Sequence, residues 1–438
     1  MTAARPDALA ALLRGEWVDP DSGASIQLPP LAVAIERSLA GIEADLVAPL
    51  GLGRRLAVVS DPTTRAVQGA RVERALARVA AIESVILDAE PHADASAVAA
   101  LRRASSSADA LVAVGSGTIN DLCKYAAAQD GKPYAVFATA PSMNGYTSKN
   151  AAITVDGHKK SLAAAAPVGV FVDLSVLAAA PARMIRAGLG DSMCRSTAQA
   201  DWLLSHHLFG TPYREAPFAL LADDESALLD DPDALLRNGP GAMRSLARTL
   251  ILSGLGMTIC EGSYPASQGE HLIIHYIDMQ APADRAAYFH GEQVGVATLT
   301  MARIQEAVLA GGPPQLRPDA ISRSELQRRF GDEVGASCWD EFDRKRPPND
   351  RLASLQQQID THWDDIRASV RRAMIPAERI HDVLRRAKCP LTPADIGVDV
   401  RFYAKAVRDA RFLRDRYTFL DLAADSQHRD VVNTALAG

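Results

Sequence analysis

Short apolar runs alternate with longer amphipathic segments through the first part of the chain. Runs of about four to eight apolar residues are typical of buried strands, and the segments between them carry apolar residues at helical spacing. Strands that alternate with helices in this way form parallel βαβ units. The pattern therefore predicts an α/β fold with a parallel sheet covered on both faces. The predicted strands are 55–61, 84–90, 109–117 and 132–140.

The pattern changes beyond residue 150. Two strand-like runs flank Asp156–Gly157, a dipeptide that favours a hairpin turn, and 168–177 predicts one more strand. From Ala180 onward strand signals nearly vanish, and long segments rich in leucine, alanine and arginine predict helices. The switch predicts two domains, an α/β domain over 1–178 and an all-helical domain over 179–438.

Several stretches are predicted to be connections. Residues up to about Ala40 form a leader that precedes the alternating pattern. The acidic run 222–233 and the proline- and glycine-rich run 311–319 interrupt helical segments, so both are expected to be solvated loops. The basic cluster 344–346 is flanked by acidic residues and followed by two prolines, and it also predicts a solvated loop.

The composition narrows the class of protein. A hydrophobic content of 48% over 438 residues is enough for a large core. The net charge of −6 gives no electrostatic reason to expect nucleic acid or an anionic membrane surface, and no apolar run approaches the length of a membrane span. The five cysteines are scattered without metal-binding spacing, and the N-terminus is not a secretory signal. We therefore expect a cytoplasmic protein with neither nucleic acid nor membrane as a partner.

Three of the ten histidines fall between Ser263 and Gly295. His271 and His275 are four residues apart in a run with helical character, so both project from one helix face. His290 follows one short connection later, where a second helix could fold back and present it. Together with a carboxylate such as Asp191, two of these imidazoles would make a three-ligand site for a divalent metal.

The histidine pair has an alternative interpretation. At this spacing two histidines are more often a surface or capping pair than a metal site. The zincin motif is excluded, because it needs glutamate directly after the first histidine, whereas Glu270 precedes His271. Glu270 is expected to point to a different helix face.

Two loops follow neighbouring predicted strands. In GSGTIND (115–121), Gly115 and Gly117 allow a tight turn, and the N–H groups of the following helix favour a phosphate. The third glycine of the usual dinucleotide fingerprint is replaced by Asn120, and two glycines occur in many turns for geometry alone. The second loop, 138–152, is an ordinary polar turn or part of a ligand site, because open α/β sheets bind ligands at the carboxyl ends of their strands. Its polar residues include Thr139, Ser142, Asn144, Thr147 and Ser148.

Asp61 ends the first of the predicted strands. An acid at this place can accept hydrogen bonds from a ribose and would repel a 2′-phosphate, which favours NAD over NADP. A turn or helix-cap acid is an equally good interpretation of Asp61.

Five segments in order and spacing resemble the sn-glycerol-1-phosphate dehydrogenases, and are most similar to their bacterial branch. This family lies within the iron-containing alcohol dehydrogenase and dehydroquinate synthase superfamily. The resemblance spans roughly Arg55 to Asp425 and includes CPLTPADIGVDVRFYAKAVRDARFLRDRYTFLDLAAD near the end of the chain. The five segments are GSGTINDLCKYAA, APSMNGYTSKNAAI, GLGDSMCRSTAQADWLLSH, PASQGEHLIIHYIDM and HGEQVG.

The resemblance implies a dehydroquinate synthase-like fold, with a Rossmann-like NAD-binding domain followed by an all-helical domain that binds metal and substrate. It implies one zinc, nickel or iron ion held by Asp191, His271 and His290, with His275 near the substrate. NADP stays open as a second cofactor, and the resemblance also implies a homo-oligomer and a role in phospholipid metabolism. The implied NAD contacts are Gly117, Thr118 and Asp121 in the glycine turn, and Thr139, Ser142 and Ser148 in the polar loop.

The implied reaction is the reversible reduction of dihydroxyacetone phosphate to sn-glycerol 1-phosphate, so a small phosphorylated ketone or polyol is the expected substrate. Asn144 stands where the family usually has aspartate at a substrate-binding position, which leaves another polyol or polyol-phosphate dehydrogenase open. A dehydroquinate-synthase-like cyclase ranks lower, because that family supplies glutamate in place of Asp191. The candidate cations for the substrate phosphate are Lys124, Lys149 and Arg195, each of which taken singly is expected at the surface.

Overall fold

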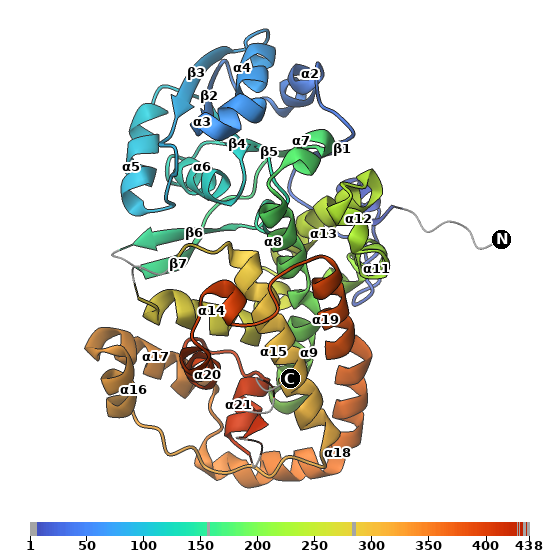
Figure 1. Ribbon diagram of the computed structural model, residues 1–438, viewed down its shortest axis with the longest axis vertical. Helices are drawn as coiled ribbons and strands as arrows, with labels where there is room; N and C mark the ends of the chain where they lie inside the picture. Colours follow the sequence, from blue (N-terminus) through green and yellow to red (C-terminus); the bar gives the residue numbers. More distant parts are fainter. Residues whose placement is uncertain are drawn as a thin grey trace, which may run out of the picture. The chain divides into compact units, whose positions relative to one another are not determined.

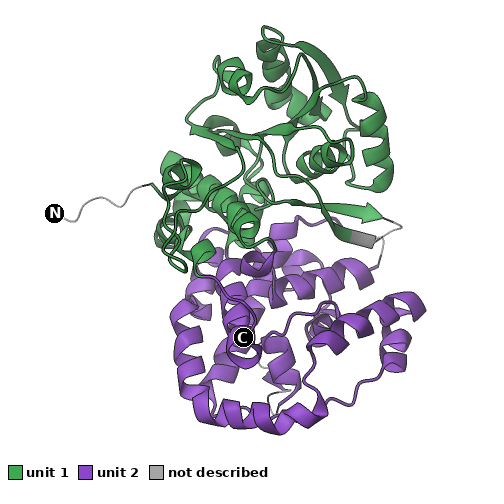
Figure 2. Cartoon of the chain, turned by 180° about the vertical axis from the view of Figure 1, so that it is seen from behind, with its two compact units in different colours: residues 1–192, 215–262 green, residues 193–214, 263–438 purple. Residues whose placement is uncertain are grey.

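The computed structural model describes residues 7–155, 158–282, 286–426, 428, 430, 431 and 435. The chain forms two compact units, shown in different colours in Figure 2. Unit 1 comprises residues 1–192 and 215–262, and unit 2 comprises residues 193–214 and 263–438. The assignment of cofactor binding to residues 1–178 and of metal and substrate binding to residues 179–438 stays a prediction.

A six-stranded sheet with the order β1-β8-β5-β4-β2-β3 forms the centre of unit 1 (Figure 1). All neighbouring strands pair in parallel, so the predicted α/β fold is confirmed. The run predicted at 168–177 is a strand only in its first half, because the Asp173 side chain accepts the N–H groups of Ser175 and Val176 and starts helix α7. The strands are β1 (Ala32–Glu36), β2 (Arg55–Ser60), β3 (Ala81–Ile86), β4 (Ala110–Gly115), β5 (Tyr134–Ala138) and β8 (Gly169–Asp173).

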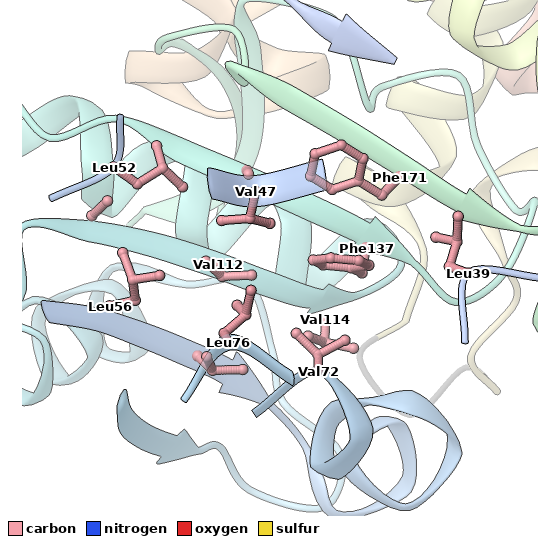
Figure 3. Close-up of a cluster of buried hydrophobic side chains, with 13 residues drawn as sticks. Leu39, Val47, Leu52, Leu56, Val72, Leu76, Val112, Val114, Phe137 and Phe171 are labelled. Carbon is pink, nitrogen blue, oxygen red and sulfur yellow. The ribbon is translucent and has the colours of Figure 1, made fainter. Parts of the chain in front are cut away.

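Helices cover both faces of this sheet. The crossover from β2 to β3 runs toward one edge, whereas those from β3 to β4 and from β4 to β5 run toward the other. Because such crossovers are right-handed, α4 lies on one face and α5 and α6 lie on the opposite face. On the α4 face, side chains from α2, α4 and four strands form a buried apolar cluster in which the rings of Phe137 and Phe171 have centroids 4.9 Å apart (Figure 3). Burial of each such large side chain contributes about 1.5–3 kcal/mol.

An additional edge strand and a β-hairpin lie outside the pattern of strands alternating with helices. The leader contains β1, an edge strand that pairs with β8 and that the hydrophobic pattern did not predict. The predicted hairpin is confirmed by the antiparallel pairing of β6 (Asn150–Val155) with β7 (His158–Ala163). Its turn residues, Asp156 and Gly157, lie outside the described residues.

The acidic run at 222–233 was predicted to be a loop, and this is wrong, because most of it forms helix α11. Leu228 is fully buried, and the Arg248 guanidinium donates to both carboxylate oxygens of Asp224. These tertiary contacts offset the repulsion between neighbouring acids. The helices of unit 1 are α1 (Ala8–Leu13), α2 (Glu43–Val47), α3 (Pro62–Thr64), α4 (Ala70–Leu76), α5 (Ala95–Ala104), α6 (Gly117–Gln129), α7 (Leu174–Ala179), α8 (Ala182–Ser192), α10 (Ala216–Ala219), α11 (Ala222–Asp230), α12 (Asp233–Leu236) and α13 (Pro240–Ile259).

The described part of unit 2 contains helices and no strand, as predicted. The run 311–319 is a loop, but the basic cluster 344–346 is not: Arg344 and Lys345 end helix α17, and the buried Lys345 ammonium lies 2.9 Å from Asp421. Among the described residues, no helix has the length and hydropathy needed to cross a bilayer. The helices of unit 2 are α9 (Cys194–Phe209), α14 (Gly269–Gln280), α15 (His290–Ala310), α16 (Arg323–Phe330), α17 (Asp332–Lys345), α18 (Leu352–Ala373), α19 (Ala377–Arg386), α20 (Val400–Asp409) and α21 (Phe419–Ala424).

Candidate functional site

The glycine turn lies where β4 ends and α6 begins. A side chain at Gly115 would place its Cβ 2.6 Å from Ile119 in the first turn of α6, so this tight connection requires glycine. The Ser116 side chain does not cap the helix, and Gly117 and Thr118 form its first residues. The N–H groups of this first turn therefore face the carboxyl end of the sheet, which is the geometry that binds a phosphate.

The polar loop after β5 lies beside this turn. The Thr139 N–H donates to the Gly115 carbonyl oxygen over 3.2 Å, and Thr139 and Ser142 are both buried. Asp121 and Ser148 are engaged within the protein. One Asp121 oxygen accepts the Ala152 N–H over 3.1 Å, and the Ser148 hydroxyl lies 3.1 Å from the Gly145 carbonyl oxygen. The structure brings the two predicted cofactor loops together, and their contacts with a cofactor stay a prediction.

The side chain of Lys124 holds the polar loop in place through hydrogen bonds. Its side chain is fully buried, and Nζ donates to the carbonyl oxygens of Gly145 over 2.5 Å and Asn150 over 3.1 Å. Burial lowers the pKa of Lys124, and the carboxylate of Asp121 at 3.8 Å opposes this shift. Lys124 was a candidate for the substrate phosphate and was expected at the surface; the structure instead places it inside, bound to loop carbonyls.

Asp61 begins helix α3. Its carboxylate accepts the Thr64 N–H over 2.7 Å, and the Asp61 N–H donates in return to the Thr64 hydroxyl over 3.0 Å. This reciprocal pair is a capping box, so the helix-cap interpretation of Asp61 is confirmed. Asp61 also lies at the carboxyl end of β2, next to β4, and its contact with a ribose stays a prediction.

Asp191 lies on α8 in unit 1 and is fully buried. Its Oδ2 accepts the backbone N–H of Asn144 over 2.8 Å, so the predicted metal ligand Asp191 lies beside Asn144, which was predicted to bind substrate. This contact needs α8 to approach the polar loop closely. A Cβ on Gly188 would lie 1.7 Å from the Pro141 carbonyl oxygen, so only glycine fits there.

The three histidines of unit 2 come together on α14 and α15. The ring centroids of His271 and His290 are 5.1 Å apart, and those of His271 and His275 are 6.3 Å apart. The predicted i, i+4 helix and the fold-back of a second helix are both confirmed. A surface pair is wrong for His271, which is only 6% exposed.

Glu270 is a candidate site residue that the sequence analysis missed. It was expected on a different helix face, yet its Oε1 lies 2.9 Å from Nδ1 of His271. Burial would raise the pKa of Glu270, but hydrogen bonds from His271 and from the Gln268 N–H hold this pKa below its usual value. An ionised carboxylate only accepts hydrogen bonds, so Nδ1 of His271 donates and its lone pair lies on Nε2. This pairing is typical of histidines that bind metal ions.

A second buried carboxylate positions the start of α14. Asp201 on α9 accepts the N–H groups of Gly269 and Phe419, each over 3.0 Å. Burial, with the charge of Glu270 adding to it, raises the pKa of Asp201 to about 8. Cys194 at the start of α9 completes this region, since its Sγ and the ligand atoms of Glu270 and His271 lie within 4.8 Å of one another.

Comparison with known proteins shows which family this chain resembles in sequence. The family model for iron-containing alcohol dehydrogenases matches residues 34–181. The glycerol-1-phosphate dehydrogenase of Bacillus licheniformis, whose name gives NAD(P)+ as its cofactor, is 30% identical over 375 residues, which are 84% of this chain and 82% of that protein. The enzyme of the same name from Bacillus subtilis is 31% identical over 329 residues, 75% of this chain and 72% of that protein.

Solved structures show the fold. The glycerol dehydrogenase of Schizosaccharomyces pombe superposes with a TM-score of 0.64 over 94% of this chain and 90% of its own, at 16% identity. The predicted fold of a parallel sheet domain followed by a helical region is confirmed by this likeness and by the matched family model.

Proposed function

This chain belongs to the glycerol-1-phosphate dehydrogenases within the iron-containing alcohol dehydrogenases, and we propose that it catalyses their reaction. In this reaction NADH reduces dihydroxyacetone phosphate to sn-glycerol 1-phosphate. The reaction is reversible, and NADPH is the second possible reductant. The observation that carries the proposal is the pair of imidazoles of His271 and His290, which lie 5.1 Å apart beside a buried carboxylate. Such a pair suits a metal-dependent dehydrogenase and has no role in a simple nucleotide-binding scaffold.

The ligands proposed for the metal are Asp191, His271 and His290. Two imidazoles and one carboxylate suit zinc, nickel or ferrous iron. What supports Asp191 as the third ligand is chain continuity: it precedes Cys194 by three residues, and Cys194 lies beside His271 in unit 2. A divalent cation held there supplies a Lewis acid for the substrate carbonyl.

The residues of the chain bind, orient and move protons in this proposal. The first turn of α6 and the polar loop hold the dinucleotide, whose nicotinamide carries the hydride. His275, with its ring 6.3 Å from that of His271, relays a proton to the substrate oxygen. Asn144 hydrogen-bonds a substrate hydroxyl, because an amide can both donate and accept.

The test is a kinetic comparison on enzyme reconstituted in turn with zinc, nickel or ferrous iron. Oxidation of NADH and of NADPH is followed with dihydroxyacetone phosphate and with unphosphorylated dihydroxyacetone. We expect activity only with added metal, a higher kcat/KM for the phosphorylated ketone, and a preference for NADH. Equal rates in the metal-free enzyme would contradict the proposal.

Another polyol or polyol-phosphate dehydrogenase is the second candidate, because Asn144 carries no charge at a proposed substrate contact. A panel of polyols and their phosphates with NAD+ separates the two. A dehydroquinate-synthase-like cyclase would instead return its NAD+ unchanged and release inorganic phosphate, which a colorimetric assay detects. The proposal also includes a cytoplasmic location and a homo-oligomer, which fractionation and light scattering of the purified chain would test.

A further inference from the structure

Two half-buried arginines lie beside the histidines of unit 2. Arg414 and Arg416 belong to the segment between the 3₁₀ turn Ala410–Phe412 and α21. Arg414 Nη2 lies 3.4 Å from Nε2 of His275. The Arg416 guanidinium lies 4.2 Å from the centre of the Tyr264 ring, and it donates to the Ser263 hydroxyl over 3.0 Å and to the Ser267 carbonyl oxygen. Arg414 therefore lies next to the His275 side chain, and Arg416 lies next to the residues that precede α14.

These two cations are not neutralised in the described part of the chain, where no carboxylate oxygen lies within 4.0 Å of either guanidinium. The nearby acids are Glu341 and Asp415, which both pair with Arg344, and Glu270, which is bound to His271. Burial lowers the pKa of Arg414. Burial and the neighbouring charge of Arg414 lower the pKa of Arg416 to about 10.

Arg411, in the 3₁₀ turn just before this segment, is an arginine with a structural role. Its guanidinium is buried and forms ion pairs with Asp319 over 2.8 Å and with Asp425 over 2.7 Å. Two half-buried guanidinium groups that repel each other without such carboxylates are unfavourable unless an anion joins them. The guanidinium fork matches a phosphate group, because it offers two parallel N–H donors.

We infer that Arg414 and Arg416 hold the phosphate group of the substrate. This inference rests on the proposed function, and it names residues for the substrate phosphate, which the sequence alone did not supply. In dihydroxyacetone phosphate one methylene and one ester oxygen separate the carbonyl carbon from phosphorus. Arg414 contacts His275, whose ring is 6.3 Å from that of His271, so Arg414 lies a short distance from the proposed reaction centre.

The cations named from sequence are engaged elsewhere. Lys124 is bound to the carbonyl oxygens of its own loop, and Arg195 Nη1 donates to the Gln199 side chain over 2.7 Å. Lys149 is exposed. None of the three combines partial burial, an open charge and contact with a site histidine, as Arg414 does.

The experiment compares the metal-loaded wild type with Arg414→Gln and Arg416→Gln. With dihydroxyacetone phosphate, we expect kcat/KM to fall about 10- to 100-fold in each variant, mainly through KM, because one charge-assisted contact with the phosphate is lost. With unphosphorylated dihydroxyacetone, kcat/KM should fall much less, because this substrate has no phosphate group to lose a contact. Inorganic phosphate should inhibit the wild type competitively against dihydroxyacetone and inhibit the variants about 10- to 100-fold more weakly.

Arg401→Gln is the matched control, because Arg401 is exposed at the start of α20 and should leave all these constants unchanged. Arg416 also contacts Tyr264 and Ser263, so its variant is checked by thermal melting. Arg414 has a single 3.4 Å contact with His275, and Arg414→Lys, which keeps the charge, should recover part of the loss.

The outcomes separate the two levels of inference. If the wild type reduces dihydroxyacetone phosphate but Arg414→Gln has the same KM, or if both substrates lose activity equally, the phosphate subsite is wrong. If the wild type does not reduce dihydroxyacetone phosphate at all, the proposed function fails. Calorimetric binding of inorganic phosphate to the wild type and to Arg414→Gln then tests the subsite by itself, and equal affinities would overturn it.

Discussion

The carboxyl edge of the sheet in unit 1 and the histidine cluster in unit 2 prepare their ligand positions differently. At the sheet edge, polar side chains hold the loops in place: Asp61 caps α3, Asp121 accepts from Ala152, and Lys124 binds loop carbonyls. The first turn of α6 adds backbone N–H groups that can bind a ligand. In unit 2 the ligand atoms are side-chain nitrogens, and buried Glu270 orients one of them.

The difference predicts different tolerance to mutation. A backbone site survives the loss of one supporting side chain if the loop keeps its shape, whereas a metal site loses a ligand with each histidine that is removed. The following variants test this contrast, from the largest expected effect to the smallest.

His271→Ala should abolish metal retention and lower kcat/KM by at least about 100-fold, because no other atom replaces the lost imidazole. NADH binding, followed by fluorescence, should remain, since the cofactor loops belong to unit 1. Elemental analysis of the dialysed protein measures the metal. The exposed His362 on α18 provides the control variant His362→Ala. Full activity of His271→Ala without bound metal would contradict the ligand assignment.

Glu270→Gln should weaken metal binding about 10- to 100-fold, because the amide keeps the shape but not the charge that orients His271. Competition with a chelator of known affinity measures the change. Burial and then the charge of Glu270 raise the pKa of Asp201, so removal of this charge should also lower that pKa from about 8. An unchanged metal affinity would show that Glu270 has only a structural role.

Lys124→Met should lower the free energy of unfolding by about 2–3 kcal/mol, since loop carbonyls lose a charged donor, and should raise the KM for NADH. The metal content should stay the same. Urea denaturation measures the stability. Lys132→Met is the matched control, because half-exposed Lys132 donates to the carbonyl oxygens of Ser105 and Ser106 and should cost less than about 1.5 kcal/mol. A KM for NADH equal to that of the wild type would show that this loop has no role in cofactor binding.

Asp61→Ser has the smallest expected effect. Serine still caps a helix, so the stability should change little, whereas Asp61→Ala should cost about 1 kcal/mol. Removal of the charge should shift the ratio of kcat/KM for NADPH and NADH by roughly fivefold toward NADPH, as expected for a loss of about 1 kcal/mol of repulsion. An unchanged ratio would leave Asp61 with its capping role alone.

The sequence predicted those parts of the fold that depend on local pattern. The strands β2, β4 and β5 have apolar runs bounded by turn residues, and the spacing of His271 and His275 follows from the helix period. It did not predict β1 at the sheet edge, where Ile35 is the one buried residue of five and the hydrophobic signal is weak. It also assigned a loop to α11, where tertiary partners outweigh the local charge repulsion.

For the site, the residue types and their order along the chain were sufficient to name the histidines, Asp191 and the two loops at the sheet edge. Only the tertiary structure decided which side chains are engaged: that Lys124 is buried in its own loop, that Glu270 turns toward His271, and that Arg414 reaches His275 from a segment 139 residues away. The physical reason is that periodicity and turn chemistry act between near neighbours, whereas burial and the pairing of charges depend on which distant segments the fold brings into contact.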